Sequence, residues 1–359
     1  MTNVDVSPLS EFAIYDLYGD RSIIIPFPHP RKILVSENGL GKTTMLNTLY
    51  AVLSGRFFKL ENLEFREIVA TFPTGSITVC KHDIEQLLQK DYENEYEEYQ
   101  EFKEKIERDE LRKLVSLARE YSPESLKELK EIQHIANSLK IPAPQLVDKL
   151  KVLANDEKDK FSPLIQQMRK HFDLEILYLT TYRRIEESLQ SLGYSPVDFQ
   201  LPSGLIQSGM DDVLDRIAKV EGIAAEYQIP TEQLLNQFTD ICNTYLVDKK
   251  IVSHVDTESI TLKVCTKKNR FIPLDTLSSG EKQIISIFSH LYLSSPRKCA
   301  ILIDEPELSI SIEWQRKLLP DILKASKCQF LVVATHSPFI FENELAANTV
   351  DLQEYVQES

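Results

Sequence analysis

Two acidic residues follow an apolar, strand-like run late in the chain. Residues 300–303 are Ala-Ile-Leu-Ile, and Asp304 and Glu305 come directly after them. A carboxylate at the end of such a strand can hold Mg²⁺, and a second carboxylate beside it can orient or deprotonate an attacking water. The segment predicts the acidic centre of a site for phosphoryl transfer, although Asp-Glu-Pro alone could also be an ordinary strand exit.

A glycine-rich loop near the start of the chain fits the same chemistry. Apolar residues 33–35 lead into Ser36 and then into Glu-Asn-Gly-Leu-Gly-Lys-Thr-Thr. A strand, a glycine-rich loop and a helix in this order are typical of sites where backbone N–H groups and a lysine bind phosphates. Ser36 occupies the place of the first glycine of the strict pattern, so we interpret the loop as degenerate but functional. The candidate nucleotide-binding residues are Asn38, Gly39, Gly41, Lys42, Thr43 and Thr44, and Thr43 is with Asp304 a candidate Mg²⁺ ligand.

Two further segments complete the set. Ser278 and Gly280 precede an apolar, helix-like stretch, and a helix N-terminus favours anions. The apolar residues 330–334 lead to His336, which we expect near Asp304 because ligands of open α/β sheets collect at the carboxyl ends of strands. Each segment alone could be structural, as a helix start or a packed histidine. Their order along one chain favours a nucleotide site.

These segments resemble motifs of the ABC-type ATPase heads found in structural-maintenance (SMC) and recombination-repair (RecF-like) proteins. Within that group the chain looks most similar to overcoming-lysogenization-type (AAA-like) ATPases of bacterial anti-phage defence. Residues 278–283 resemble the signature, residues 303–309 resemble the Walker B strand with its dimer-contact loop, and residues 334–338 resemble the switch histidine. Residues 182–186 also look like a segment of the defence ATPases, whereas Ile310-Ser311 replaces the Leu-His that relatives often carry.

The resemblance implies an α/β fold, an ABC-type P-loop ATPase head with an inserted helical arm. It implies that ATP and Mg²⁺ are bound, that Glu305 and His336 are catalytic, and that Ser278 and Gly280 of one copy close over nucleotide held by another. A homodimer or higher homo-oligomer follows. We expect the ATPase subunit of an anti-phage defence module that restrains or activates a separate nuclease or toxin. A RecF-like DNA-repair ATPase and a non-hydrolysing, nucleotide-locked scaffold remain alternatives.

The elements that must position these residues fall into three parts. We expect an ATPase lobe with the loop over residues 1–82, a helical arm over residues 83–170 and the rest of the head over residues 171–359. Apolar residues at spacings of three and four predict one arm helix beginning near Ile84 and a second that ends before Pro142. Before residue 278, the pattern predicts further helices and then a strand-like segment across residues 252–264.

Composition restricts the choice of partners. The 359 residues carry a net charge of −14, which opposes a broadly phosphate-attracting surface but allows a local basic patch. Many acidic residues lie within residues 91–110, where we expect a protein-binding surface rather than a nucleic-acid one. Five scattered cysteines without a Cys-x-x-Cys pair predict reduced thiols. With no signal-peptide pattern and no apolar run of about 20 residues, we expect a cytoplasmic protein without a membrane span.

Overall fold

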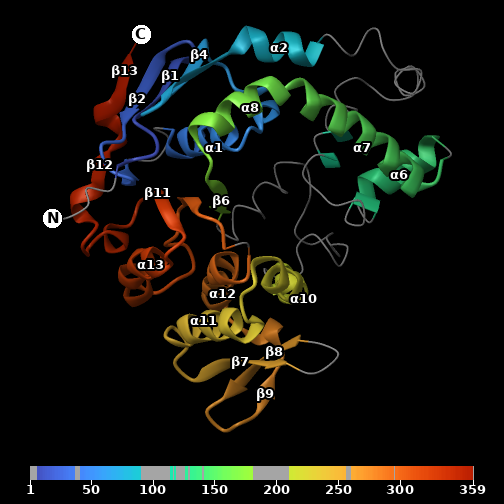
Figure 1. The fold of residues 1–359 in the computed structure, drawn as a ribbon, viewed down its shortest axis with the longest axis vertical. Helices are drawn as coiled ribbons and strands as arrows, with labels where there is room; N and C mark the ends of the chain where they lie inside the picture. The colour runs from blue at the N-terminus through green and yellow to red at the C-terminus, as the bar shows by residue number, and fades with distance from the viewer. Residues whose placement is uncertain are drawn as a thin grey trace.

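The chain has an α/β fold (Figure 1). The computed structural model describes residues 6–36, 41–89, 114–115, 117–118, 126–127, 130–139, 141–180, 210–255, 260–294 and 296–358. At its centre lies a parallel sheet in the order β12 (Thr349–Asp351), β3 (Arg31–Val35), β11 (Cys328–Thr335), β10 (Cys299–Asp304) and β6 (Glu175–Thr180). Because every pair is parallel, the carboxyl ends of these strands share one edge, with Asp304 opposite Ala334 and Thr335 opposite Val35.

Strands β10 and β11 of this sheet are covered on both faces. Every residue of β10 is buried, and successive residues face different hydrophobic clusters. Ile301 and Ile303 pack in the cluster that contains α12 (Ser279–Tyr292) and α13 (Ile312–Lys324). Ala300 and Leu302 pack on the other side with α1 (Lys42–Leu53). Continuous apolar runs are typical of parallel strands covered on both faces, which explains why the sequence pattern identified them.

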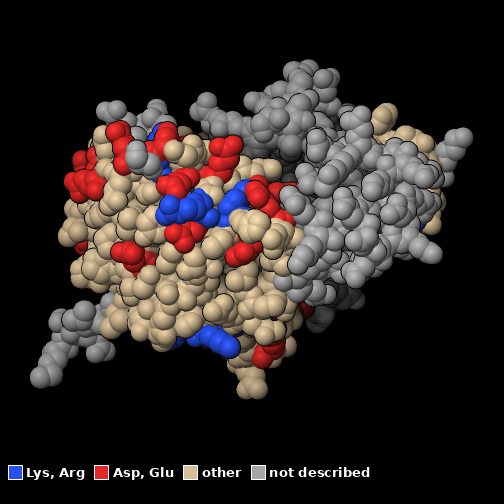
Figure 2. Space-filling model, turned by 90° about the horizontal axis from the view of Figure 1, so that it is seen from above, with Lys and Arg blue, Asp and Glu red and all other residues tan. Residues whose placement is uncertain are grey.

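An antiparallel sheet closes over the other side of α1. Its order is β13 (Val356–Glu358), β2 (Arg21–Pro26), β1 (Glu11–Leu17), β4 (Glu67–Phe72) and β5 (Gly75–Cys80). This sheet, α1 and α8 (Ser162–His171) share one core, to which Ile84 of α2 (Lys81–Gln89) also belongs. Seen from above (Figure 2), acidic side chains spread over the described part of this side, with a smaller group of basic ones between them.

Within the range expected for the arm, helices α6 (Lys130–Leu139) and α7 (Ala143–Lys160) belong to a small hydrophobic cluster separate from the two larger ones. Helix α6 packs on α7, and the cluster includes Ile132, Leu146 and Leu150. Helix α6 ends before Pro142, as expected, and Pro144 lies in the first turn of α7, where its missing N–H is tolerated. Of the first helix expected in the arm, the structure describes only α2, which ends at Gln89. Residues 90–113 lie outside the described residues.

Two helices and a small sheet precede α12 in the chain. Helices α10 (Met210–Tyr227) and α11 (Thr231–Asn243) pack against a three-stranded antiparallel sheet of β7 (Lys249–Val255), β8 (Ile260–Thr266) and β9 (Phe271–Ile272). The strand-like segment expected over residues 252–264 corresponds to two paired strands, β7 and β8, with a break between them. The four polar residues between them, which lie outside the described residues, have turn-forming character. Within the described part of the chain, no helix is long and apolar enough to cross a membrane.

Candidate functional site

Lys42 is the first residue of α1 and its side chain is held at the end of β3. Gly41 precedes it with φ 88°, a left-handed conformation that glycine adopts without a steric penalty. The Lys42 Nζ donates to the carbonyl oxygen of Ser36 at 2.7 Å and to its Oγ at 2.9 Å. The same Nζ lies 3.4 Å from Nδ1 of His336, which follows β11. Lys42 and His336, about 290 residues apart in sequence, therefore lie next to each other in the fold.

The environment of Lys42 suits a phosphate-binding cation. Its side chain is buried, and this burial lowers the pKa of the Lys42 amine. Nearby carboxylates, first Glu305 and then Asp304, favour the charged form and act in the opposite direction. A cation partly stripped of water binds a phosphate oxygen more strongly than one in bulk solvent.

Asp304 and Glu305 stand at the carboxyl end of β10 in different surroundings. Asp304 is completely buried, and a buried carboxylate requires a cation or hydrogen-bond donors around it. Glu305 has φ 50°, and its N–H donates to the Ala334 carbonyl oxygen at 2.8 Å. Its Oε1 lies 4.0 Å from Nε2 of His336. A left-handed non-glycine residue is uncommon and often marks a functional site, and here it aims Glu305 towards the histidine.

The donor set fits a magnesium-bound nucleotide. Carboxylate and hydroxyl oxygens are the ligands that Mg²⁺ prefers, and the buried Asp304 supplies the first kind. Thr43 and Thr44 lie half-buried in the first turn of α1, close in sequence to Lys42. Asn38 and Gly39 lie outside the described residues, so their predicted role stays a prediction.

Glu307 fixes the histidine segment, a role that the sequence pattern did not reveal. Its carboxylate accepts a hydrogen bond from Thr335 Oγ1 at 2.7 Å and another from the His336 N–H at 2.7 Å. Both oxygens are thereby engaged with the end of β11. The only hint in the sequence is a third acidic residue two positions after Glu305, and a surface charge would look the same. The contact ties the position of His336 to the loop that carries Glu305.

Two glutamines tie that loop, residues 305–310, to the neighbouring helices. Gln315 of α13 donates from Nε2 to the Ile310 carbonyl oxygen at 3.1 Å, and its Oε1 accepts from Ser337 Oγ at 2.6 Å. Gln283 of α12 donates to the Pro306 carbonyl oxygen at 3.1 Å. Both glutamines are buried. The loop is therefore bonded to β11, α12 and α13, so a shift of one element reaches the others.

Ser278 caps the start of α12, as the sequence predicted. Its Oγ accepts from the Glu281 N–H at 3.3 Å, while Glu281 Oε2 accepts from the Ser278 N–H at 2.7 Å, which is a capping box. Lys249 of β7 contacts both Glu281 oxygens, at 2.8 and 2.9 Å. Burial alone would raise the pKa of Glu281, but the donors on Lys249 and Ser278 outweigh it and hold that pKa below its usual value. Ser278 itself is exposed at the helix start.

Gly280 lies against its own chain. A Cβ built at this position would be 2.3 Å from the Ser309 carbonyl oxygen, and Ser309 has φ 67°. Only glycine lets the first turn of α12 approach the loop this closely. The resemblance assigns Gly280 to the nucleotide of another copy, and its close contact within one chain gives it a packing role as well.

We therefore expect Gly280→Ala to lower stability. The added methyl group must push α12 away from the backbone of Ser309, and overpacking of this kind costs about 1–3 kcal/mol. Thermal unfolding of the purified chain measures the loss. The exposed neighbour Ser279 provides the matched control, because Ser279→Ala should change stability by less than about 0.5 kcal/mol. Equal melting temperatures for the two variants would contradict the close contact.

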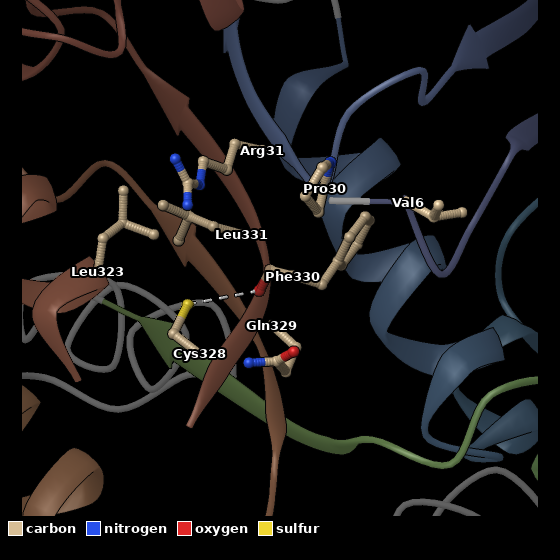
Figure 3. A pocket seen from close by; sticks show the side chains of 8 residues that line it. All are labelled: Val6, Pro30, Arg31, Leu323, Cys328, Gln329, Phe330 and Leu331. Carbon is tan, nitrogen blue, oxygen red and sulfur yellow. Dashed lines mark hydrogen bonds between the residues drawn. The ribbon is translucent and has the colours of Figure 1, made fainter. Parts of the chain in front are cut away.

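A small pocket at the opposite edge of the sheet lies away from these residues. It lies near the amino ends of β3 and β11 (Figure 3). Its volume is about 80 Å³. Arg31 and Cys328 are among its lining residues. Burial raises the pKa of the Cys328 thiol to about 12, so this sulfur stays protonated and unreactive at neutral pH. Of the five cysteines, all free thiols, Cys242, Cys265 and Cys299 are buried and the other two half-buried.

The arrangement can be compared with known structures. The Smc head domain of Pyrococcus furiosus, crystallised with an extended coiled coil and bound to the C-terminal domain of ScpA, is 10% identical, with a TM-score of 0.40 over 98% of this chain and 96% of that one. The SMC head domain from Thermotoga maritima is 13% identical, with a TM-score of 0.36 over 93% and 91% of the two chains. At this low similarity, the role of a residue in those head domains cannot be assigned to a residue of this chain.

At the level of sequence, no curated protein gives a significant match to the chain. A family model does match residues 211–342, and it is described as "AAA domain, putative AbiEii toxin, Type IV TA system". The matched segment runs from α10 through β11 to the loop after it, so it contains Ser278, Asp304, Glu305 and His336 but not the glycine-rich loop. Over this segment the chain is similar to an AAA domain associated with toxin–antitoxin systems.

Proposed function

We propose that the chain binds and hydrolyses ATP at the carboxyl edge of the parallel sheet. The observation that carries this proposal is the meeting of three segments, in which Lys42 lies 3.4 Å from His336 and His336 lies 4.0 Å from Glu305. A buried lysine, a carboxylate and an imidazole within such distances suit phosphoryl transfer to water better than any other reaction those groups support. The match of residues 211–342 to an AAA domain supports the same choice.

Each residue then has a defined task. Lys42, with the N–H groups of the loop that includes Asn38, Gly39 and Gly41, binds the β- and γ-phosphates. Thr43 and Asp304 hold Mg²⁺, which when bound neutralises charge on the phosphate oxygens.

The remaining tasks concern the attacking water and the γ-phosphate. Glu305 orients this water or accepts its proton, and His336 contacts the γ-phosphate. Because Glu307 holds the backbone of His336, it is a positioning residue for this step.

A second candidate, the nucleotide-locked scaffold, is favoured by the contact between Lys42 and Ser36. The Ser36 hydroxyl and carbonyl oxygens already occupy two donors of the Lys42 amine. A phosphate must compete with these oxygens for the Lys42 amine, which weakens ATP binding and favours slow turnover. Phosphate release by the purified chain with Mg²⁺ and ATP separates the two functions. Steady turnover supports the ATPase, whereas ATP binding without release above a Lys42→Ala background supports the scaffold.

The biological output that we propose is control of a separate effector in a bacterial anti-phage defence module. The exposed start of α12 at Ser278 suits closure over nucleotide held by a second copy, giving a homodimer or larger homo-oligomer. Hydrolysis would loosen this interface and so change the state of the assembly. The toxin–antitoxin description of the matched family supports an effector that is a toxin or nuclease.

The acidic part of the arm is our candidate for effector recognition. Glu95, Glu97, Glu98 and Glu101 lie outside the described residues, but their charges cannot neutralise phosphates and can complement a basic protein. The candidate effector for a pull-down is the protein encoded by the adjacent gene. Changing all four residues to lysine should abolish capture of that protein and leave ATP turnover intact. A control with the same change in charge uses four exposed acidic residues of α10 and α11, namely Glu221, Glu226, Glu232 and Asp240. Unchanged capture by the arm variant would place recognition on the head.

A further inference from the structure

Basic side chains gather on the outer face of the β7–β9 sheet, in a chain whose net charge is −14. In β7 and β8, Lys250 pairs with Cys265 and Val252 pairs with Lys263, and Cys265 also pairs with Phe271 of β9. Directly opposed residues of antiparallel strands point to the same side, so Lys250, Lys263 and Phe271 share one face. Lys267, Lys268 and Arg270 follow in the exposed turn between β8 and β9. We call these six residues the basic sheet face.

The opposite side of the same sheet is part of the core. Ile251 and Val264, which pair with each other, are 1% and 0% exposed and belong to the cluster that contains α10 and α11. This leaves the basic sheet face towards solvent, and Figure 1 places the sheet at the opposite end of the molecule from α2. Phe271 is 64% exposed, although an exposed phenylalanine is costly in water. The Lys263 Nζ lies 5.5 Å from the centre of its ring.

The charges of this face are largely available to a ligand. Lys267 forms an ion pair with Asp248 at 2.7 Å. Among the described residues, no acidic side chain forms an ion pair with the other four cations, which are Lys250, Lys263, Lys268 and Arg270. All four are exposed. On a protein with a net charge of −14, these four cations provide a local positive surface for an anionic ligand.

We propose that the basic sheet face binds single-stranded nucleic acid. Four cations can neutralise successive phosphates, and an exposed aromatic ring on the open face of a sheet provides a platform on which an unpaired base can stack. A duplex fits less well, because its bases are already stacked and its long run of phosphates would meet acidic surface beyond this short sheet. An acidic protein segment would use the cations but has no need of a stacking ring.

The basic sheet face is connected to α12 through Lys249, the residue next to Lys250. Lys249, the neighbour of Lys250 in β7, holds the Glu281 carboxylate that caps Ser278. A strand that shifts on binding would therefore move the start of α12. If the proposed ATPase function holds, nucleic acid bound here is a trigger that changes closure over ATP. The binding itself does not depend on that function.

Fluorescence anisotropy of a labelled oligo-dT with the full chain, without nucleotide, tests the binding. Four neutralised phosphates give a slope of about −2.8 in log K against log salt, so the affinity should fall about fiftyfold between 50 and 200 mM salt. Phe271→Ala should weaken binding about tenfold, as expected for one lost stacking contact. The combined reversal Lys263→Glu, Lys268→Glu and Arg270→Glu should abolish binding.

The matched control reverses three exposed cations elsewhere, Lys59, Lys170 and Lys298, with the same change in net charge. Equal weakening by this control would overturn the proposal, since net charge alone would then explain the effect. Competition by polyglutamate as strong as by unlabelled oligo-dT, together with unchanged affinity of Phe271→Ala, would also overturn it in favour of an acidic protein. Lys42→Ala, which disables the proposed ATP site, should bind oligo-dT normally, so failure of one proposal is distinguishable from failure of the other.

Discussion

Replacing Glu305 by glutamine should leave ATP binding intact and lower ATP turnover by at least about a hundredfold. Glutamine keeps the size and the hydrogen-bonding reach of the side chain but cannot accept a proton from water. The backbone conformation of Glu305, with φ 50° and its N–H bonded to Ala334, does not depend on the carboxylate. The substitution therefore removes the carboxylate while this backbone conformation is retained. Nucleotide-bound dimers or larger assemblies should accumulate, because closure remains and hydrolysis does not.

Two measurements on one preparation check this expectation. Calorimetric titration with ATP gives the affinity, and phosphate release gives the turnover. Glu313→Gln is the matched control, since Glu313 is an exposed glutamate eight residues further on, in the first turn of α13. This variant should hydrolyse ATP at the parental rate. Parental turnover in Glu305→Gln would show that another group activates the water. Loss of ATP binding would instead show that Glu305 holds the ligand.

Local patterns predicted the parts of the fold that local chemistry determines. Strands β10 and β11 are continuous apolar runs because both of their faces are covered, and that property can be read from a short window. Ser278 is a good cap with Glu281 three residues later, so the start of α12 was also predictable. The order of these elements predicted one parallel sheet whose carboxyl edge brings Asp304 and His336 together, as β10 and β11 do.

Contacts between distant residues were not predictable in the same way. The bond from Thr335 to Glu307 joins residues 28 apart, and its geometry depends on the register between β10 and β11. The sequence likewise gives no sign that Gly280 rests on Ser309. The basic sheet face was hidden because its cations are dispersed between residues 250 and 270, and only the antiparallel pairing of β7, β8 and β9 gathers them.

Lys42→Ala and Ser278→Arg should separate nucleotide binding from closure. Lys42→Ala removes the amine that would donate hydrogen bonds to the phosphates. Hydrogen bonds to charged groups contribute about 1.5–3 kcal/mol each, so ATP affinity should fall at least about a hundredfold. Ser278 is exposed, and the helix that it caps packs in a different hydrophobic cluster from α1. Arginine there should leave the affinity of a single chain for ATP unchanged and obstruct the approach of a second chain. Affinity is measured with a fluorescent ATP analogue at low protein concentration, and assembly by light scattering.

Matched variants keep structural effects apart from these functional ones. Lys42 is buried, and methionine fills the same space without charge. Lys42→Met should therefore lose ATP affinity to the same extent as Lys42→Ala, but should be more stable than that variant. Ser278→Asn preserves a good N-cap, whereas arginine removes the cap at a cost of about 0.5–2 kcal/mol. We expect Ser278→Asn to assemble and Ser278→Arg not to assemble, while both bind ATP with the same affinity. Asparagine keeps the cap of α12 and leaves room for a second chain, whereas arginine obstructs the approach of that chain. Equal loss of ATP affinity in Lys42→Ala and Ser278→Arg would mean that both residues serve one chain's own nucleotide, and the shared site between two copies would have to be abandoned.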